Sequence, residues 1–271
     1  MSERLRAMFE RCRAAGRPAF MPYITAGYPG AAETVPLLLA LEAGGADAIE
    51  LGVPFSDPMA DGATIQHANY VAVEQGVSFA DCLGFVRTAR ERGLEAPVIL
   101  MGYYNPLLAY GEERAPGDAA AAGADGFIVV DLPPEEAGRF LVACRGADMS
   151  FVPLVAPTTA DTRIAKIAGA ADAFLYCVSV LGTTGQRAAL PEELPGFIGR
   201  VRGLTGLPLA VGFGIGTREH VEEVGRIADA AVIGSAIIAT IDAADEAHRA
   251  QRVREFVESV TGHKQAGGDG P

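Results

Sequence analysis

The sequence has no uninterrupted apolar stretch close to the roughly 20 residues that a membrane-spanning helix needs. It is also short of positive charge, because 22 basic side chains face 34 acidic ones and the formal net charge is -12. A charge of this sign argues against nucleic acid and against an anionic membrane surface as partners. We therefore expect a soluble protein that holds any anionic ligand by local groups.

Cysteine, lysine and histidine are scarce and scattered. The four cysteines form no CxxC pair, so the sequence predicts neither a disulfide framework nor a zinc site, and a reducing cytoplasm fits best. Lys166 falls in a helical pattern and Lys264 near the C-terminus, so neither is placed to form a Schiff base inside a core. Three histidines fall in expected helices and one in the tail, which argues against a His-rich metal site; they are His67, His220, His248 and His263.

Eight short apolar runs recur along the 271 residues, each bounded by Gly, Pro or Asp. They lie near residues 19–27, 46–53, 97–104, 125–133, 150–157, 173–181, 207–215 and 229–237. Helical patterns separate them, which favours parallel strands covered on their outer face. Eight such units predict a single (β/α)8 barrel domain over residues 1–264. The alternative is a doubly wound open sheet, but no GxGxxG follows the first run.

Three regions exceed a minimal barrel. An amphipathic pattern over residues 1–16 predicts an extra N-terminal helix, and long connections follow the second and the sixth runs. Loops that follow strands open on the catalytic face of a barrel, where long ones are usually functional. The tail, residues 265–271, lacks large apolar side chains, so we expect it to be disordered.

An acidic residue, Glu50, interrupts the second apolar run. Strand alternation places it on the same side as Ala48 and Gly52, opposite the branched residues of that run, so it faces the barrel interior. Burial there raises a carboxyl pKa and allows proton exchange near neutral pH. The alternative is a structural glutamate paired with a buried arginine, but none of the eight runs contains a basic residue.

Two aspartates follow in the loop after the second run. Asp61 precedes a helix start, so taken alone it is best explained as an N-cap. Its position in the long loop above Glu50 makes a second catalytic role plausible. Asp57, between Ser56 and Pro58, is most simply a turn residue.

Three glycine clusters follow the last three runs: GTTG (182–185), GFGIG (212–216) and GSA (234–236). Backbone N–H groups at such turns, with a helix N-terminus aimed at the site, bind phosphate without a side-chain cation. Barrels commonly hold phosphate at this place. With no suitably placed lysine and no metal site, the sequence predicts general acid–base chemistry on a phosphorylated substrate.

The segment ELGVPFSDPMADGATIQ (residues 50–66), followed in order by GTTG, GFGIG and GSAI, resembles the signature of the tryptophan synthase alpha chain family. The resemblance extends from about the first strand to the last helix. It implies a lyase with a (β/α) barrel that cleaves indole-3-glycerol phosphate to indole and glyceraldehyde 3-phosphate without a cofactor of its own. Glu50 would protonate the indole carbon, and Asp61 would accept a hydrogen bond from the indole N–H.

The same resemblance implies the rest of the site. The indole pocket would be lined by Tyr23, Met101, Tyr103, Tyr176 and Phe213, although for such residues core packing is the simpler explanation. The phosphate would lie against Gly185, Gly214, Gly234 and Ser235. The loop around Thr184 would close over the substrate. Tyr23 and Met101 stand where the family pattern often has phenylalanine and leucine.

The family resemblance also implies a partner. The alpha chain binds a beta chain in an α2β2 tetramer, and that beta chain carries pyridoxal phosphate and condenses indole with L-serine. The segment with Pro54, Phe55 and Asp57 resembles the surface that contacts the beta chain.

Two other functions fit part of the sequence. A different phosphosugar barrel, such as an isomerase or epimerase, would explain the glycine clusters but not the loop with Asp61. A non-catalytic barrel that only regulates a beta chain is the second alternative, and the presence of both Glu50 and Asp61 counts against it.

Overall fold

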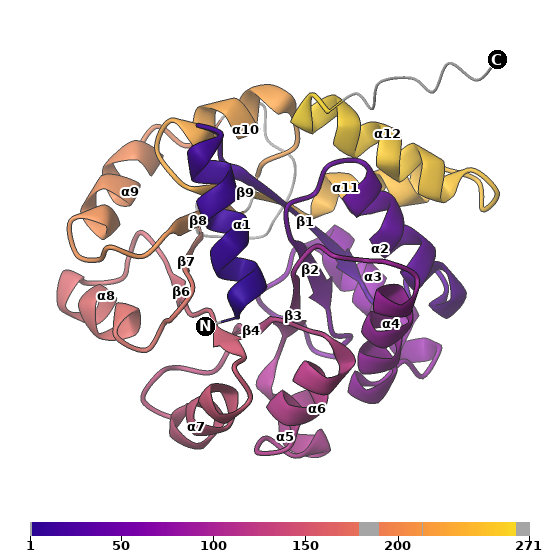
Figure 1. Ribbon diagram of the computed structural model, residues 1–271, viewed down its shortest axis with the longest axis horizontal. Coiled ribbons are helices and arrows are strands. Elements are labelled where there is room, and N and C mark those ends of the chain that lie inside the picture. Colours follow the sequence, from indigo (N-terminus) through magenta and orange to yellow (C-terminus); the bar gives the residue numbers. More distant parts are fainter. Residues whose placement is uncertain (1, 179–189, 213, 264–271) are drawn as a thin grey trace.

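The chain folds into a barrel of parallel strands inside a ring of helices (Figure 1). The computed structural model describes residues 2–178, 190–212 and 214–263. The strands are β1 (Ala19–Thr25), β2 (Ile49–Gly52), β3 (Val98–Gly102), β4 (Gly126–Val129), β5 (Ser150–Phe151), β6 (Leu154–Val155), β7 (Leu175–Val178), β8 (Leu209–Gly212) and β9 (Ala230–Ile233).

Most of the helices connect the strands and cover their outer face, whereas α1 precedes the first strand. The helices are α1 (Glu3–Ala14), the 3-10 turn η1 (Ala31–Glu33), α2 (Thr34–Ala43), α3 (Ala63–Glu74), α4 (Phe79–Glu91), α5 (Tyr104–Tyr110), α6 (Ala115–Ala122), α7 (Gly138–Gly146), α8 (Asp161–Ala168), α9 (Leu194–Arg202), α10 (Arg218–Gly225), α11 (Ser235–Ala243) and α12 (Arg249–Thr261). The predicted (β/α)8 architecture is confirmed.

The strand order is β5-β4-β3-β2-β1-β9-β8-β7-β6, and every pairing is parallel. Because β5 and β6 follow each other along the chain, the sheet closes on itself through this segment. The sequence predicts one strand there, over residues 150–157, and this prediction is wrong in detail. Pro153 has no N–H to give to a ladder, so the strand is interrupted between its pairing with β4 and its pairing with β7.

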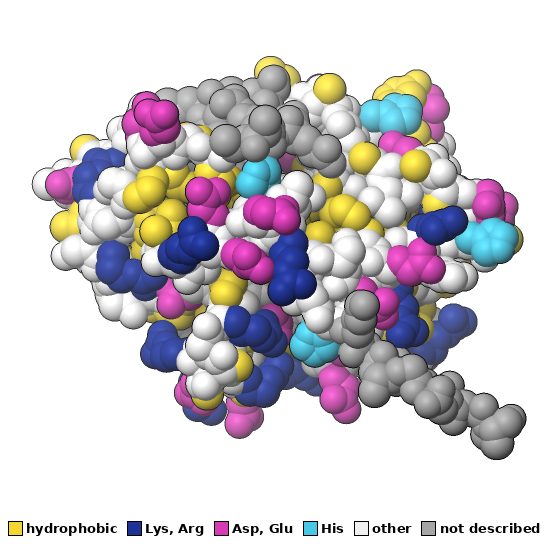
Figure 2. All heavy atoms as spheres, turned by 90° about the horizontal axis from the view of Figure 1, so that it is seen from above, with side chains coloured by type: hydrophobic (Ala, Val, Ile, Leu, Met, Phe, Trp, Pro, Cys, Tyr) yellow, Lys and Arg dark blue, Asp and Glu magenta, His cyan; other side chains and the backbone are white. Residues whose placement is uncertain are grey.

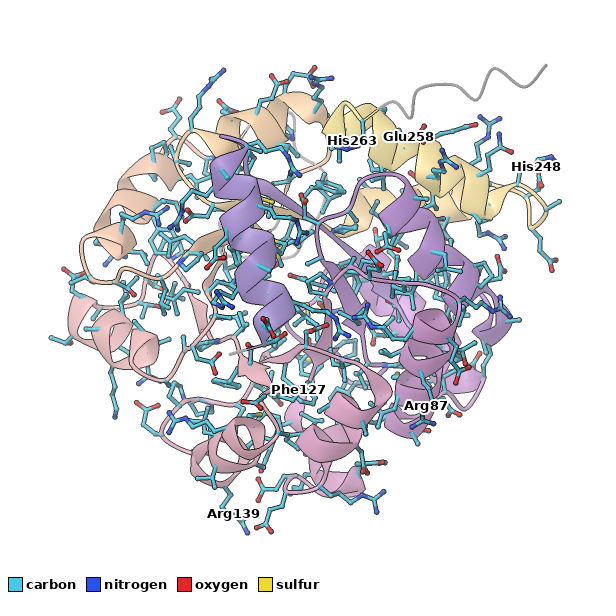
Figure 3. The ribbon with its side chains drawn as sticks, viewed as in Figure 1. Arg87, Phe127, Arg139, His248, Glu258 and His263 are labelled. Atoms are coloured by element: carbon cyan, nitrogen blue, oxygen red, sulfur yellow. The ribbon has the colours of Figure 1, made fainter. Side chains whose placement is uncertain are left out.

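Two apolar clusters fill the molecule. One lies between the strands and the outer helices, where Phe127 of β4, labelled in Figure 3, packs against Phe79 of α4 and Phe140 of α7. The other fills the barrel interior. Ile49 and Leu51 of β2 belong to the outer cluster and Ala48 to the inner one. The predicted alternation around Glu50 is therefore confirmed.

Helix α1 closes one end of the barrel, as Figure 1 shows. Its buried residues Leu5, Met8, Phe9 and Cys12 all belong to the inner cluster. The ring of Phe9 lies 5.5 Å, between centroids, from that of Phe174 next to β7. The N-terminal amphipathic helix is thus confirmed, and it leaves the opposite end of the barrel for a site.

Three aspartates brace the same end, each one or two residues before a strand. Asp47, Asp125 and Asp229 each accept a bond from a backbone N–H of the preceding strand and each pair with an arginine. The backbone donors are Phe20, Val98 and Leu209, and the arginines are Arg17, Arg90 and Arg202, in that order. Hydrogen bonds to charged groups are the stronger ones, so this end is tied together by strand-to-strand links.

Charged side chains of both signs are interspersed over the face drawn in Figure 2. Helices α10 and α12 each carry an (i,i+4) ion pair, Arg218–Glu222 and Arg254–Glu258. His248 and His263, labelled in Figure 3, lie near the two ends of α12, away from the strands. The sequence places His248 inside a helix, but it is the N-cap residue of α12.

Among the described residues, no helix is both long and apolar enough to cross a membrane.

Candidate active site

The carboxyl group of Glu50 is enclosed in the barrel interior. Glu50 is 0 % exposed, and in β2 it pairs in register with Tyr23 of β1 and Ile99 of β3. Within the described part of the chain, neither carboxyl oxygen has a hydrogen-bond partner. Burial without a partner raises the pKa of Glu50 well above its usual range. No described arginine pairs with it, so the interpretation as a structural ion pair is wrong there.

Asp61 lies in the loop between β2 and α3 and is 7 % exposed. The hydroxyl of Tyr103 donates a hydrogen bond of 3.0 Å to its Oδ2 atom. Burial raises the pKa of Asp61 to about 6, and the Tyr103 bond opposes that rise. The N-cap of α3 is Gly62, with no side-chain cap bond, so the expectation that Asp61 caps this helix is wrong.

The charges of both acids act on the hydroxyl group of Tyr176. Its hydroxyl is buried, and desolvation, followed by the charges of Glu50 and Asp61, raises the pKa of Tyr176 well above its usual range. The pKa of Tyr23 is raised in the same way by burial and by Asp61. The two acids and two tyrosines therefore share the mouth of the barrel.

Two glycines make room for these tyrosines. A Cβ atom on Gly52, at the end of β2, would lie 2.1 Å from the Tyr23 hydroxyl oxygen. A Cβ atom on Gly212, at the end of β8, would lie 1.9 Å from the Tyr176 hydroxyl oxygen. The side chain of each tyrosine thus fills the space over the glycine of the next strand. Any residue larger than glycine at that place in the next strand would collide with the tyrosine.

Part of the predicted anion-binding region lies beside Tyr23. Gly214 has a φ of +81°, the left-handed conformation that glycine adopts freely. Gly234 is the N-cap of α11 and Ser235 its first residue, and among the described residues no side chain caps that N-terminus. A Cβ atom on Gly234 would lie 3.5 Å from the Tyr23 ring, so the helix N-terminus lies beside this tyrosine. Free N–H groups at such a terminus suit a phosphate.

The other predicted residues divide into three groups. Met101, at the end of β3, is buried in the inner cluster with Tyr23 and Tyr176. In the partner segment Pro54 is buried, Phe55 is partly exposed, and Asp57 is exposed and accepts a bond from Ser56 Oγ. Outside the described residues lie Thr184, Gly185 and Phe213.

The sequence did not single out Asn69, which lies in α3 and is 2 % exposed. Its side chain accepts a bond of 3.1 Å from the N–H of Phe55 and donates one to the carbonyl of Ile65. A hydrogen bond from Asn69 also acts to lower the pKa of Tyr23. Asn69 therefore anchors the start of the loop that leads to Asp61. The one signal in the sequence is a polar residue four positions after Ile65, on the same side of the helix.

The described residues contain no cluster of three or more His, Cys, Asp or Glu side chains that could hold a metal ion. The four cysteines are buried and unpaired. The chemical groups that the site offers are thus a buried carboxyl group, a second carboxylate near pKa 6, tyrosine hydroxyls and a helix N-terminus.

Comparisons with known proteins identify this arrangement. Residues 9–267 match the family model described as tryptophan synthase alpha chain. The tryptophan synthase alpha chain of Roseiflexus castenholzii is 51 % identical over 259 residues, which are 96 % of this chain and 99 % of that protein.

Solved structures agree. The crystal structure of tryptophan synthase subunit alpha from Legionella pneumophila has a TM-score of 0.88 at 38 % identity, covering 96 % of this chain and 97 % of its own. A chain of Mycobacterium tuberculosis tryptophan synthase has a TM-score of 0.89 at 33 % identity, covering 97 % and 98 %. The chain belongs to the tryptophan synthase alpha chain family.

Proposed function

We propose that Glu50 and Asp61 catalyse the cleavage of indole-3-glycerol phosphate to indole and glyceraldehyde 3-phosphate, the reaction of this family. The observation that carries the proposal is the Glu50 carboxyl group, which is buried, without a described partner, and close enough to Asp61 for both charges to act on Tyr176. An unpaired buried acid costs stability, and a role in proton transfer explains why it stands there.

The chemistry follows from the two pKa values. Glu50, whose raised pKa favours the protonated form, gives its proton to C3 of the indole ring, and positive charge develops on the ring nitrogen. Asp61, ionised above about pH 6, accepts the N–H hydrogen bond and stabilises that charge. The ring then takes the electron pair of the bond to the glycerol carbon. The glycerol hydroxyl loses its proton to the Glu50 carboxylate and becomes the aldehyde, which restores the acid.

The rest of the substrate would be held by the surrounding groups. Tyr23, Met101, Tyr103 and Tyr176 would contact the indole ring, and the N-terminus of α11 at Gly234 and Ser235, with Gly214, would bind the phosphate. The roles of Thr184 in closure, of Gly185 in phosphate binding and of Phe213 in the pocket remain predictions from the sequence.

The partner of this chain would be a tryptophan synthase beta chain in an α2β2 tetramer, with pyridoxal phosphate on the beta chain and no cofactor on this one. The segment with Pro54, Phe55 and Asp57 would contact it. One domain over residues 1–264 and a cytoplasmic location complete the proposal, and the tail predicted over residues 265–271 lies outside the described residues. The four unpaired cysteines support that location.

Indole release from indole-3-glycerol phosphate, measured with and without a cognate beta chain, tests the proposal. We expect release by the wild type and its loss in Asp61→Asn. Conversion of a phosphosugar without indole release would favour an isomerase or epimerase. Stimulation of the beta chain without any indole release would favour the non-catalytic regulator.

A further inference from the structure

Tyr103 follows β3 directly and is 6 % exposed. Its hydroxyl makes two hydrogen bonds to the loop between β2 and α3. It accepts one of 2.9 Å from the N–H of Ala60 and donates one of 3.0 Å to Oδ2 of Asp61. A residue more than 40 positions along the chain thus fixes both the backbone before Asp61 and the direction of its carboxylate.

The ring of Tyr103 contacts the beginning of the same loop. Its centroid lies 5.1 Å from that of Phe55, with 31° between the ring planes. Phe55 is partly exposed and is held by the bond from its N–H to Asn69. Between these two anchored ends, Met59 is 86 % exposed, whereas the neighbouring Pro58 is buried. Tyr103 therefore contacts both ends of this loop, Phe55 at its start and Ala60 and Asp61 at its end.

We propose that Tyr103 is the positioning residue for Asp61 and that its ring links the partner-facing segment at Phe55 to that carboxylate. The inference rests on the proposed function, because it takes Asp61 as a catalytic group. Movement of Phe55 would shift the ring of Tyr103, and with it the hydroxyl that aims Asp61. A displacement of about 1 Å in a catalytic group is enough to cost a large factor in rate.

The same geometry predicts a pH signature. Among the described titratable groups, Tyr103, Tyr23 and Tyr176 each feel the charge of Asp61, and Glu50 acts on the same Tyr176. Tyr103 donates to the ionised form of Asp61 and so opposes the rise in its pKa. Without the hydroxyl the pKa of Asp61 rises further, so the loss of activity on acidification begins at a higher pH.

The test compares Tyr103→Phe with Tyr104→Phe in the assembled complex with a cognate beta chain. Tyr104 is the matched control, because its hydroxyl donates to Glu112, a carboxylate that is not part of the site. We expect Tyr103→Phe to lower kcat about tenfold or more with little change in KM, and to move the acidic limb of the kcat profile to higher pH. Tyr104→Phe should match the wild type in both.

Each outcome is decisive. If Asp61→Asn abolishes turnover but Tyr103→Phe retains the wild-type kcat and profile, the inference is overturned and the proposed function stands. If Asp61→Asn keeps its activity, the proposed function fails and the inference fails with it. A loss of rate in Tyr103→Phe without a shift of the limb shows a purely structural role and also overturns it.

Phe55→Leu tests the same link by changing the ring that contacts Tyr103. It also provides a test if Tyr103→Phe does not fold. At saturating beta chain we expect its acidic limb to move in the same direction. Added to Tyr103→Phe it should have no further effect, since the two residues act through one contact. An unshifted limb in Phe55→Leu overturns the link.

Discussion

Tyr23 lies so closely across Gly52 that a Cβ atom on this glycine would come within 2.1 Å of the tyrosine hydroxyl oxygen. Both residues are buried, and Tyr23 pairs in register with Glu50 on the neighbouring strand. The hydroxyl also lies 3.1 Å from Thr25 Oγ1. The position of the Tyr23 side chain, on the strand next to Glu50, therefore depends on the absence of a side chain at position 52.

Gly52→Ala should displace Tyr23 and cost about 1–3 kcal/mol of stability, the usual range for overpacking. We expect turnover to fall as well, because the displaced ring borders both Glu50 and Gly234. The matched control is Gly84→Ala in α4, where a Cβ atom would meet nothing within 4 Å, and alanine is favoured in a helix interior. Urea unfolding and kcat/KM of the two variants check this; equal behaviour would refute the packing argument.

The pH dependence of kcat/KM should be bell-shaped. Asp61 must be ionised, so activity should fall as the pH drops through about 6. Glu50 must be protonated, and because burial raises its pKa, activity should fall again only at a pH well above the usual range for glutamate. Steady-state rates between pH 5 and pH 9 check both limbs. A profile flat from pH 5 to pH 7 would contradict the role of Asp61.

Gly234→Asp should weaken substrate binding by about tenfold or more, because it puts a carboxylate at the N-terminus proposed to bind the phosphate. Its Cβ atom would also lie only 3.3 Å from Ile65 Cδ1. Inhibition constants for glycerol phosphate measure the effect. Gly146→Asp, at the end of α7 where a Cβ atom meets nothing within 4 Å, adds the same charge as a control. Equal inhibition constants in the two variants would show that the phosphate binds elsewhere.

Glu50→Gln should stabilise the fold, most of all at high pH. The folded-state pKa of Glu50 is raised, so stability from its protonation is present below the unfolded pKa, near 4.5, and is lost as the pH rises through the folded value. Glutamine has no such loss. We expect a gain of about 1–3 kcal/mol at pH 8 and a smaller one at pH 5, measured by urea unfolding. A gain that does not change with pH would mean that Glu50 titrates normally.

Much of the fold could be predicted because strand and helix patterns are local. The apolar runs located the barrel strands, and the alternation around Glu50 set its direction. Pro153 shows the limit, since the effect of one missing N–H depends on which neighbour each half of the strand pairs with. The end of the eighth run was overestimated, because the apolar residues continue into α11.

The site could be predicted in part. Glu50 stands out as an acid in an apolar run, and Asp61 follows from the family signature. The bond between Tyr103 and Asp61 could not be foreseen, because it joins two segments 42 positions apart whose distance depends on the closed barrel. Asn69 was missed for the same reason: its role comes from contacts across the loop and not from its own neighbours.

Turnover of Glu50→Gln tests the central claim most directly. The substitution keeps the size of the side chain and removes only the transferable proton. We predict a fall in kcat for indole release of roughly a hundredfold or more, with KM little changed and the fold intact. A variant that releases indole at close to the wild-type rate would show that Glu50 is not the proton donor.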